Sequence, residues 1–398
     1  MPIKKEDFMI QRKKKRTANI GFFSVVHETY FGQFDGLEEK LRFYHAETVK
    51  ILVKNDVNVI DYGIVASNAE AFGATGKMNA DGLDLLFCNM ITYATSSVFA
   101  PIIKNVGVPV VLTALQPLRR LDYTKASTFM QLENDNICSV PEFTGVAIRM
   151  GKKVADVVIG CLYGDDEAER NIAEWCDIAK VLHSLKGARI GLMGHVLEAM
   201  YDMNADPTAI SEAFGVHVPL IEIDDAVKCY EEVTDGEIEA KKKLILEEFD
   251  TPMPKSDPVT EKLTEADLER AARGAAALDR LVAEKRLTGL AYYYEGREGT
   301  IQRETSTSFI VGNSILNAEG TPMCGEFDIK TCIAMLIMDR LGIGGSFAEL
   351  HPFDFDEDFI LVGHDGPHHI AIAEGKPVLR SLKKFHGKPG SGASVEFK

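Results

Sequence analysis

Runs of apolar residues alternate with amphipathic stretches through the first 185 residues. Residues 19–26 (NIGFFSVV) are almost entirely apolar, which is typical of a strand buried on both faces of a parallel sheet. Further strands are predicted at residues 57–64, 83–89, 108–115 and 155–160, and helices at 37–54, 97–106, 142–151 and 165–185. This alternation of strands and helices predicts a doubly wound parallel sheet.

The same plan recurs after residue 186. Strands are predicted at residues 189–193, 216–223 and 289–294, two helices within 224–250 and one helix at 263–284. Between the helices, TPMPKSDP at residues 251–258 is the most linker-like segment of the chain. We therefore expect a second α/β domain.

The last part of the chain has a different pattern. A helix predicted at residues 329–341 is followed by short strands with Gly and Pro turns, which are typical of a β-rich domain. These strands are predicted at residues 359–362 (a buried strand), 369–373, 377–382 and 393–397. We thus predict three domains, at residues 1–185, 186–320 and 321–398. Because the chain stops at Lys398 inside a strand-like run, we expect the C-terminal β domain to be incomplete.

Composition excludes some classes of protein. The net charge of −16 argues against nucleic acid as the main partner, because like charges repel phosphate. The basic run at residues 13–16 is either a nucleic-acid patch or, as we expect, a solvated segment before the first strand. No apolar run approaches the roughly 20 residues that a membrane helix needs. The length of 398 residues agrees with two or three domains.

The cysteines indicate a reducing compartment. An odd, scattered set without a C-x-x-C pair is typical of free thiols, so we expect a cytoplasmic protein. Cys138 and Cys324 differ from the others only in lying beside candidate site segments. The seven cysteines are Cys88, Cys138, Cys161, Cys176, Cys229, Cys324 and Cys332.

Nucleotide-binding signatures are missing from the sequence. No G-x-G-x-x-G follows the first strand and no P-loop occurs, which argues against a dehydrogenase and against an NTPase. Ligands of doubly wound sheets bind at the carboxyl ends of the strands. That rule draws attention to His27, Asn89 and Gln116, which stand at or after the ends of predicted strands.

Two carboxylates and a histidine carry the candidate chemistry. Glu326 lies just before the helix at 329–341, Glu349 lies in a short polar break after it, and His364 follows the strand at 359–362. Two oxygens and one nitrogen are ligands that suit Mn²⁺ or Mg²⁺. The alternative is that Glu326 caps the helix at its positive dipole end, Glu349 is solvated and His364 is a turn residue.

Three motifs in this stretch resemble those of a known family. CGEFDIKT at residues 324–331, GGSFAE at 344–349 and LVGH at 361–364 are similar, in order and spacing, to segments of the L-arabinose isomerase and L-fucose isomerase superfamily. L-arabinose isomerase-like proteins are the most similar. Weaker similarity extends over most of the chain. It includes residues 27–32, 129–143, 235–236 and 294–295.

The resemblance implies a cytoplasmic aldose–ketose isomerase that uses Mn²⁺, with Mg²⁺ or Co²⁺ as alternatives. Glu326 and Glu349 would be metal ligands and the acid/base pair, and His364 a third ligand. The metal polarises the sugar oxygens while the carboxylates move a proton between C1 and C2 through a cis-enediol. Two nearby carboxylates share protons, so one can stay protonated.

The resemblance also carries expectations about partners and shape. The substrate would be a free pentose, hexose or deoxy sugar, contacted by Tyr294, His27 and Asn134. The implied fold is two α/β domains followed by a barrel-like β domain, assembled as homo-trimers or hexamers.

This sequence departs from the family pattern at three points. The family's second histidine ligand falls beyond Lys398, with His368 or His369 as the alternative. His27 stands near a family glutamine, and Cys138 stands near a substrate-contacting histidine. These changes support the family level and leave the sugar open. A non-catalytic sugar-binding relative and a sugar epimerase remain as alternative functions.

Overall fold

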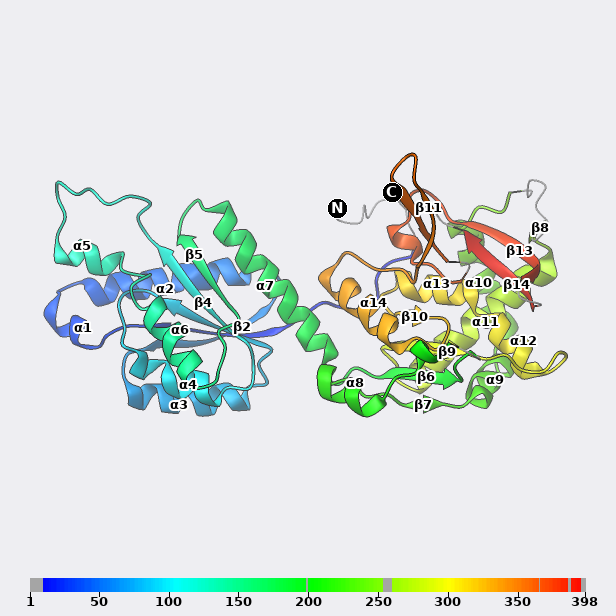
Figure 1. Cartoon of the computed structure of the whole chain (residues 1–398), viewed down its shortest axis with the longest axis horizontal. Helices are drawn as coiled ribbons and strands as arrows, with labels where there is room; N and C mark the ends of the chain where they lie inside the picture. Colours follow the sequence, from blue (N-terminus) through cyan, green and yellow to red (C-terminus); the bar gives the residue numbers. More distant parts are fainter. Residues whose placement is uncertain (1–9, 198–199, 253–259, 365, 386–387, 395–398) are drawn as a thin grey trace. The chain divides into compact units, whose positions relative to one another are not determined.

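The computed structural model places the chain in two compact units. It describes residues 10–197, 200–252, 260–364, 366–385 and 388–394. The first unit is Arg16–Ser184, and the second combines Met1–Lys15 with Leu185–Lys398. Figure 1 gives the labels of the helices and strands used below.

The first unit is built on a five-stranded parallel sheet of order β2-β1-β3-β4-β5. Side chains of β1 alternate between its faces, so that Phe22 enters one core and Phe23 the other. Helices α2 and α7 supply the first core, and α3, α4 and α6 supply the second (Figure 1). The predicted doubly wound sheet is confirmed for this unit. Its strands are β1 (Asn19–Val25), β2 (Asn58–Val65), β3 (Leu85–Met90), β4 (Val110–Gln116) and β5 (Asp156–Cys161). Its helices are α1 (Thr29–Gln33), α2 (Leu37–Val53), α3 (Asn68–Ala80), η1 (Ser96–Val98), α4 (Ala100–Asn105), α5 (Thr128–Glu133), α6 (Val140–Arg149) and α7 (Asp166–Leu185).

A four-stranded parallel sheet of order β10-β9-β6-β7 forms the second unit. Helices α9, α10, α11 and α13 share one large core with β9. The strand predicted at residues 216–223 is shorter than expected, with only two residues in β7. The strands are β6 (Ile190–Gly194), β7 (Leu220–Ile221), β9 (Gly289–Tyr293) and β10 (Met323–Cys324). The helices are η2 (Tyr201–Met203), α8 (Pro207–Phe214), α9 (Ile223–Glu231), α10 (Asp235–Glu248), α11 (Glu265–Glu284), α12 (Ile301–Thr307), α13 (Ile310–Ala318) and α14 (Ile329–Leu341).

The β-rich part of the second unit consists of two small antiparallel sheets. One is a hairpin of β11 (Glu349–Asp354) and β12 (Phe359–Gly363). The other has the order β14-β13-β8, and the described residues form no closed barrel. Its strands are β8 (Thr260–Glu261), β13 (Val378–Phe385) and β14 (Lys388–Ser394).

Two predictions about this part were wrong. Residues 369–373 form no strand: η3 (Ile370–Ile372) is a short 3₁₀ turn, because the backbone amides of Ile372 and Ala373 bond to carbonyls three residues back. The strand predicted at 359–362 exists as β12, but most of it is exposed, because no second layer of the described residues covers it.

Other boundaries have a mixed outcome. Most of the predicted linker at 251–258, and the end of the strand predicted at 393–397, lie outside the described residues. The predicted boundary at residue 320 falls inside the second unit, just before β10, which pairs with β9. The division of that unit into two domains stays a prediction.

All seven cysteines are free. Among the described helices, none is long and apolar enough to cross a membrane.

Candidate metal centre

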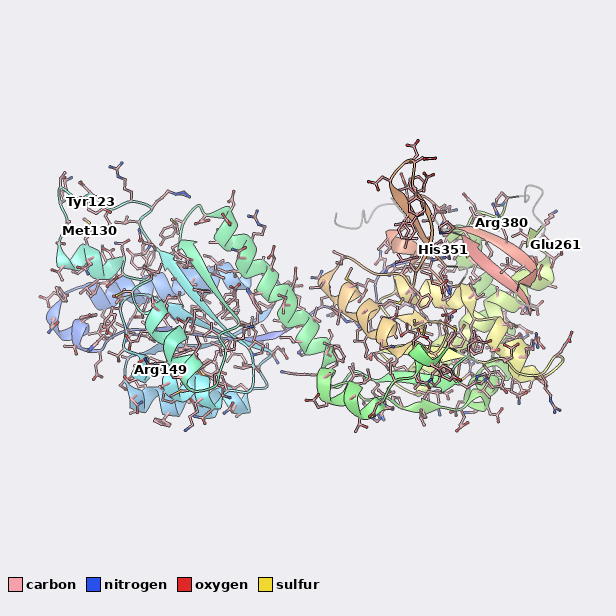
Figure 2. All side chains as sticks on the ribbon, viewed as in Figure 1. Tyr123, Met130, Arg149, Glu261, His351 and Arg380 are labelled. Atoms are coloured by element: carbon pink, nitrogen blue, oxygen red, sulfur yellow. The ribbon has the colours of Figure 1, made fainter. Side chains whose placement is uncertain are left out.

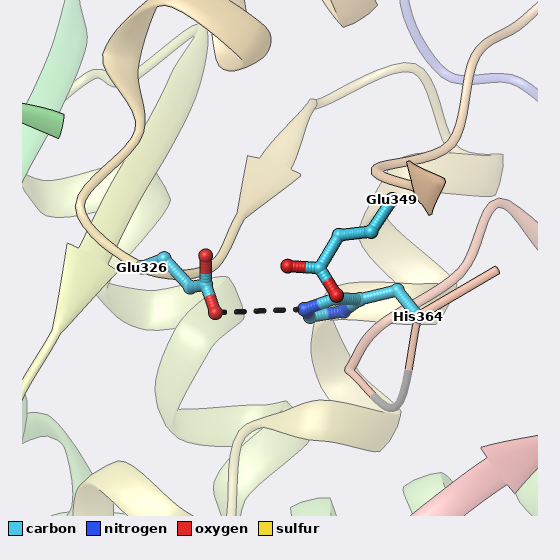
Figure 3. Close-up of side chains that lie close together, drawn as sticks. All are labelled: Glu326, Glu349 and His364. Carbon is cyan, nitrogen blue, oxygen red and sulfur yellow. Dashed lines mark ion pairs between the residues drawn. The ribbon is translucent and has the colours of Figure 1, made fainter. Parts of the chain in front are cut away.

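Glu326, Glu349 and His364 converge in the second unit (Figure 3). Glu326 follows β10, Glu349 is the first residue of β11, and His364 follows β12. One ligand atom from each of the three side chains lies within 4.8 Å of the other two. Nε2 of His364 lies 3.8 Å from Oε1 of Glu326. The sequence therefore named three residues that the fold brings together.

Backbone geometry presents Glu326 at the end of β10. Glu326 and Phe327 both adopt left-handed backbone angles, with φ of 57° and 67°. Such angles are costly for residues other than glycine and tend to occur at functional sites. The helix α14 that follows is capped by Asp328, whose carboxylate accepts from the backbone N–H of Thr331 at 3.0 Å and from its hydroxyl at 2.6 Å. The alternative in which Glu326 caps this helix was therefore wrong.

The hairpin brings the other two candidate ligands close together. Glu349 is paired with Gly363 across the two strands, and His364 is the next residue. The imidazole of His364 lies edge-to-face on Phe347, with ring centroids 4.4 Å apart. The carbonyl of His364 lies 2.9 Å from Nε2 of His368, and this contact helps to fix the loop that carries His364.

The donor set fits a hard divalent cation. Oε2 of Glu326 is buried and has no hydrogen-bond partner, as expected of an oxygen prepared for an ion. Ligands of an ion bound at about 2.1 Å lie at most about 4.2 Å apart, and the three donor atoms here lie within 4.8 Å of one another, which is close to that spacing. One hydrogen bond must open before the ion can bind. Nδ1 of His364 accepts from the N–H of Gly366 at 2.9 Å, whereas an Nε2 ligand needs the proton on Nδ1.

Neither His368 nor His369 belongs to the cluster formed by the described residues. Nδ1 of His368 lies 3.3 Å from the hydroxyl of Ser346, and its other nitrogen faces the carbonyl of His364. Burial lowers the pKa of His369 and favours its neutral form. The alternative of a fourth ligand from these two residues is not supported by their positions.

Aromatic residues lie at the carboxyl ends of the strands of the four-stranded sheet, which is the edge where Glu326 follows β10. Tyr294 follows β9, and its ring lies 5.9 Å from that of His195, which follows β6. The sequence analysis predicted Tyr294 as a substrate contact, but it did not predict that His195 and Tyr293 lie beside it. The rings of His195 and Tyr293 are 5.5 Å apart. Burial, the hydrogen bond to Glu295 and the nearby charge of Glu326 raise the pKa of Tyr293.

The two remaining predicted contacts belong to the first unit. His27 follows β1 and stacks on Tyr93 at 6.2 Å, close to the point where the strand order reverses between β1 and β3. That point is where ligands of doubly wound sheets bind. Asn134 is buried. Its amide nitrogen donates to the carbonyl of Met130, and its side-chain oxygen accepts from the N–H of Leu118. A sugar contact by either residue stays a prediction.

Comparison with known proteins supports a distant relationship. No family model matches the chain. It is 27% identical over 246 residues to an L-arabinose isomerase of Nocardioides sp., and this match covers 60% of the chain and 47% of that enzyme. The chain thus spans about half the length of the curated relative that it matches. A ligand-free, open structure of a substrate-binding protein with adhesive properties from Clostridium difficile is 12% identical, covering 82% of this chain and 96% of that one. Its TM-score of 0.20 is too low to support an argument about fold.

Proposed function

We propose that the protein is a metal-dependent isomerase that interconverts an aldose and a ketose. The observation that carries this proposal is the convergence of Glu326, Glu349 and His364, with one oxygen of Glu326 buried and unpartnered. The similarity to an L-arabinose isomerase supports the same reaction class. The substrate is a free pentose, hexose or deoxy sugar.

Glu326, Glu349 and His364 would hold Mn²⁺, with Mg²⁺ or Co²⁺ as alternatives. When bound, the ion would polarise the carbonyl and hydroxyl oxygens at C1 and C2 of the sugar. Hard carboxylate oxygens with a single imidazole favour these metals over a metal that prefers thiolates.

The two carboxylates carry the proton transfers. One of Glu326 and Glu349 removes the proton from C2 of the open-chain aldose, and a cis-enediol forms. The same carboxylate returns the proton to C1, while the other moves a proton between the two oxygens. The net result is a ketose, with no proton gained or lost. Tyr294 and His195 follow neighbouring strands of the sheet and their rings lie 5.9 Å apart, which supports the proposal that they border the sugar.

Product analysis on a panel of aldoses with added Mn²⁺ tests this proposal. Wild type should form a ketose, and Glu326→Gln and Glu349→Gln should each form at least about 1,000-fold less, because each variant lacks one acid/base group and one charged ligand. Glu298→Gln is the matched control, since Glu298 is exposed on the loop after β9 and lies outside the cluster. An aldose product instead of a ketose would identify an epimerase. Sugar binding without turnover would identify a binding protein.

A further inference from the structure

The hairpin of β11 and β12 exposes an apolar face. Its register pairs Leu350 with Val362 and Phe353 with Ile360, which places these four side chains on one face. Phe353 is 60% exposed, and its ring stacks at 5.8 Å on Phe355, which is 90% exposed. The hairpin projects from the rest of the second unit in Figure 1, and Figure 2 labels His351 on β11. Because an isolated hairpin is only marginally stable in water, such a surface indicates a binding partner.

The tip of the hairpin is acidic. Its turn has the sequence DFDED at residues 354–358. The side chain of Asp354 accepts from the backbone amides of Asp356 and Glu357, which fixes the turn. Among the described residues, Asp356, Glu357 and Asp358 form no ion pair. A partner surface for this tip must therefore be apolar with cations at its rim.

The second unit itself contains such a surface at the opposite edge of its sheet. A cavity of about 490 Å³ opens at the amino ends of β9 and β10, beside Thr288 and Thr321. Its lining includes three buried apolar residues and three cations: Val282, Leu287 and Leu316, and Lys13, Lys14 and Arg286.

Two of these cations have no acidic partner in the part of the chain that the structure describes. Glu319 in the lining is already paired with Lys13 at 2.7 Å, and Asp279 is paired with a lysine of α10 at 2.7 Å. Lys14 and Arg286 form no ion pair with any described residue. The cavity therefore keeps an excess of positive charge over an apolar floor, although the whole chain carries −16.

We propose that the acidic hairpin of one copy of this chain docks into the cationic cavity of a second copy. The base of the hairpin lies at Glu326, beyond the carboxyl end of β10, whereas the cavity lies at the amino ends of the strands. The hairpin is thus anchored away from the cavity of its own chain. Contacts between two different surfaces of identical chains are head-to-tail, and they form a closed ring when the rotation between copies allows it.

Docking would also bear on the metal centre. Glu349 and His364 stand at the base of the hairpin, so burying the hairpin on a second copy holds two ligands in place. The test of the interface measures mass alone, so its outcome does not depend on whether the protein catalyses the proposed reaction.

Sedimentation velocity of the full chain at about 10 µM, in 50 mM and in 500 mM NaCl, is the first experiment. Wild type should be oligomeric at low salt, and Phe353→Ser with Phe355→Ser should sediment as a monomer with an unchanged circular dichroism spectrum. Phe359→Ser with Leu361→Ser is the matched control on the opposite face of the hairpin, where these side chains are 49% and 54% exposed, and should stay oligomeric. A monomeric wild type, or an oligomeric Phe353/Phe355 variant, overturns the proposal.

Charge reversal tests the head-to-tail arrangement. Asp356→Lys, Glu357→Lys and Asp358→Lys together give a basic tip, and Lys14→Glu with Arg286→Glu gives an acidic cavity. Each variant alone should be monomeric, because its tip and its cavity then carry the same sign of charge. An equimolar mixture should assemble again into particles heavier than the monomer, because the tip of each variant then meets the cavity of the other. If the mixture stays monomeric, or if the tip variant alone assembles through hairpin-to-hairpin contacts, the cavity is not the docking site.

Discussion

Replacing Glu326 by glutamine should have opposite effects on stability with and without metal. In the metal-free protein, the carboxylates of Glu326 and Glu349 lie within 4.8 Å, and one oxygen of Glu326 is buried without a partner. Glu326→Gln removes one of these two negative charges. The metal-free variant should therefore be more stable than wild type, and the metal-bound variant less stable.

The size of the effect follows from the geometry. The closest oxygens of Glu326 and Glu349 lie no more than 4.8 Å apart. Two unit charges at that limiting distance repel by about 1 kcal/mol at the dielectric constant of water and by about 3 kcal/mol at an effective value near 20. Glu326 is partly exposed, so we expect a gain of about 1–2 kcal/mol in EDTA. Wild type should gain about 2.7 kcal/mol from Mn²⁺ at 100 times its Kd. At about 2–4 °C per kcal/mol, this raises Tm by about 5–10 °C.

Thermal unfolding in EDTA and in excess Mn²⁺ provides the assay. The Tm of Glu326→Gln should exceed that of wild type in EDTA and fall below it in Mn²⁺. Glu298→Gln, on an exposed loop of the same unit, should match wild type in both. If Mn²⁺ raises the Tm of wild type and Glu326→Gln equally, the ion does not bind at this carboxylate.

Three further predictions concern other parts of the molecule. Asp328→Ala removes the N-cap of α14 and should lower the free energy of unfolding by about 1 kcal/mol in urea titrations. It should also weaken Mn²⁺ binding, because Glu326 lies two residues earlier in the chain. Asp328→Asn should retain the wild-type stability and the wild-type Mn²⁺ affinity. Hydrogen bonds from Arg280 and Thr234 lower the pKa of Glu237 to about 2, so its contribution to stability is complete above its unfolded value near 4.5 and is lost as pH falls toward 2. Glu237→Gln should flatten that part of the stability–pH profile, and an unchanged slope would contradict this assignment. Partial burial and two nearby carboxylates raise the pKa of the Cys138 thiol, although the residue is exposed at the surface. Alkylation of the folded protein should therefore be slow at pH 7 and should accelerate above pH 9. Most of this alkylation should be lost in Cys138→Ser.

Local signals were sufficient where one segment determines its own structure. The helix predicted at residues 329–341 has the same ends in the structure, because Asp328 caps it and Gly342 ends it with φ of 87°. The run at 19–26 became β1 because unbroken apolar sequence suits a strand covered on both faces. The three residues of the candidate metal centre could be named in advance because their motifs lie close together in the sequence.

Signals failed where the outcome depends on distant segments. The apolar run at 359–362 predicted burial, yet an apolar pattern does not specify which surface covers it, and β12 is mostly exposed. The alternation at 369–373 resembled a strand, but Ile370 packs in the core that contains α13, and none of the described strands pairs with it. His195 stands about 130 residues before Glu326, so only the pairing of β6 with β9 brings its ring to this edge of the sheet.

Equilibrium binding of Mn²⁺, followed by electron paramagnetic resonance, tests the metal centre most directly. Wild type should bind one ion per chain. Mn²⁺ binding should be weakened by about 100-fold or more in each of three variants: Glu326→Gln, Glu349→Gln and His364→Ala. The reason is that loss of a metal ligand should cost at least as much affinity as loss of a residue that only supports a ligand. Glu298→Gln should bind Mn²⁺ like wild type. Three ligand variants that bind Mn²⁺ as tightly as wild type would show that Glu326, Glu349 and His364 form no metal centre.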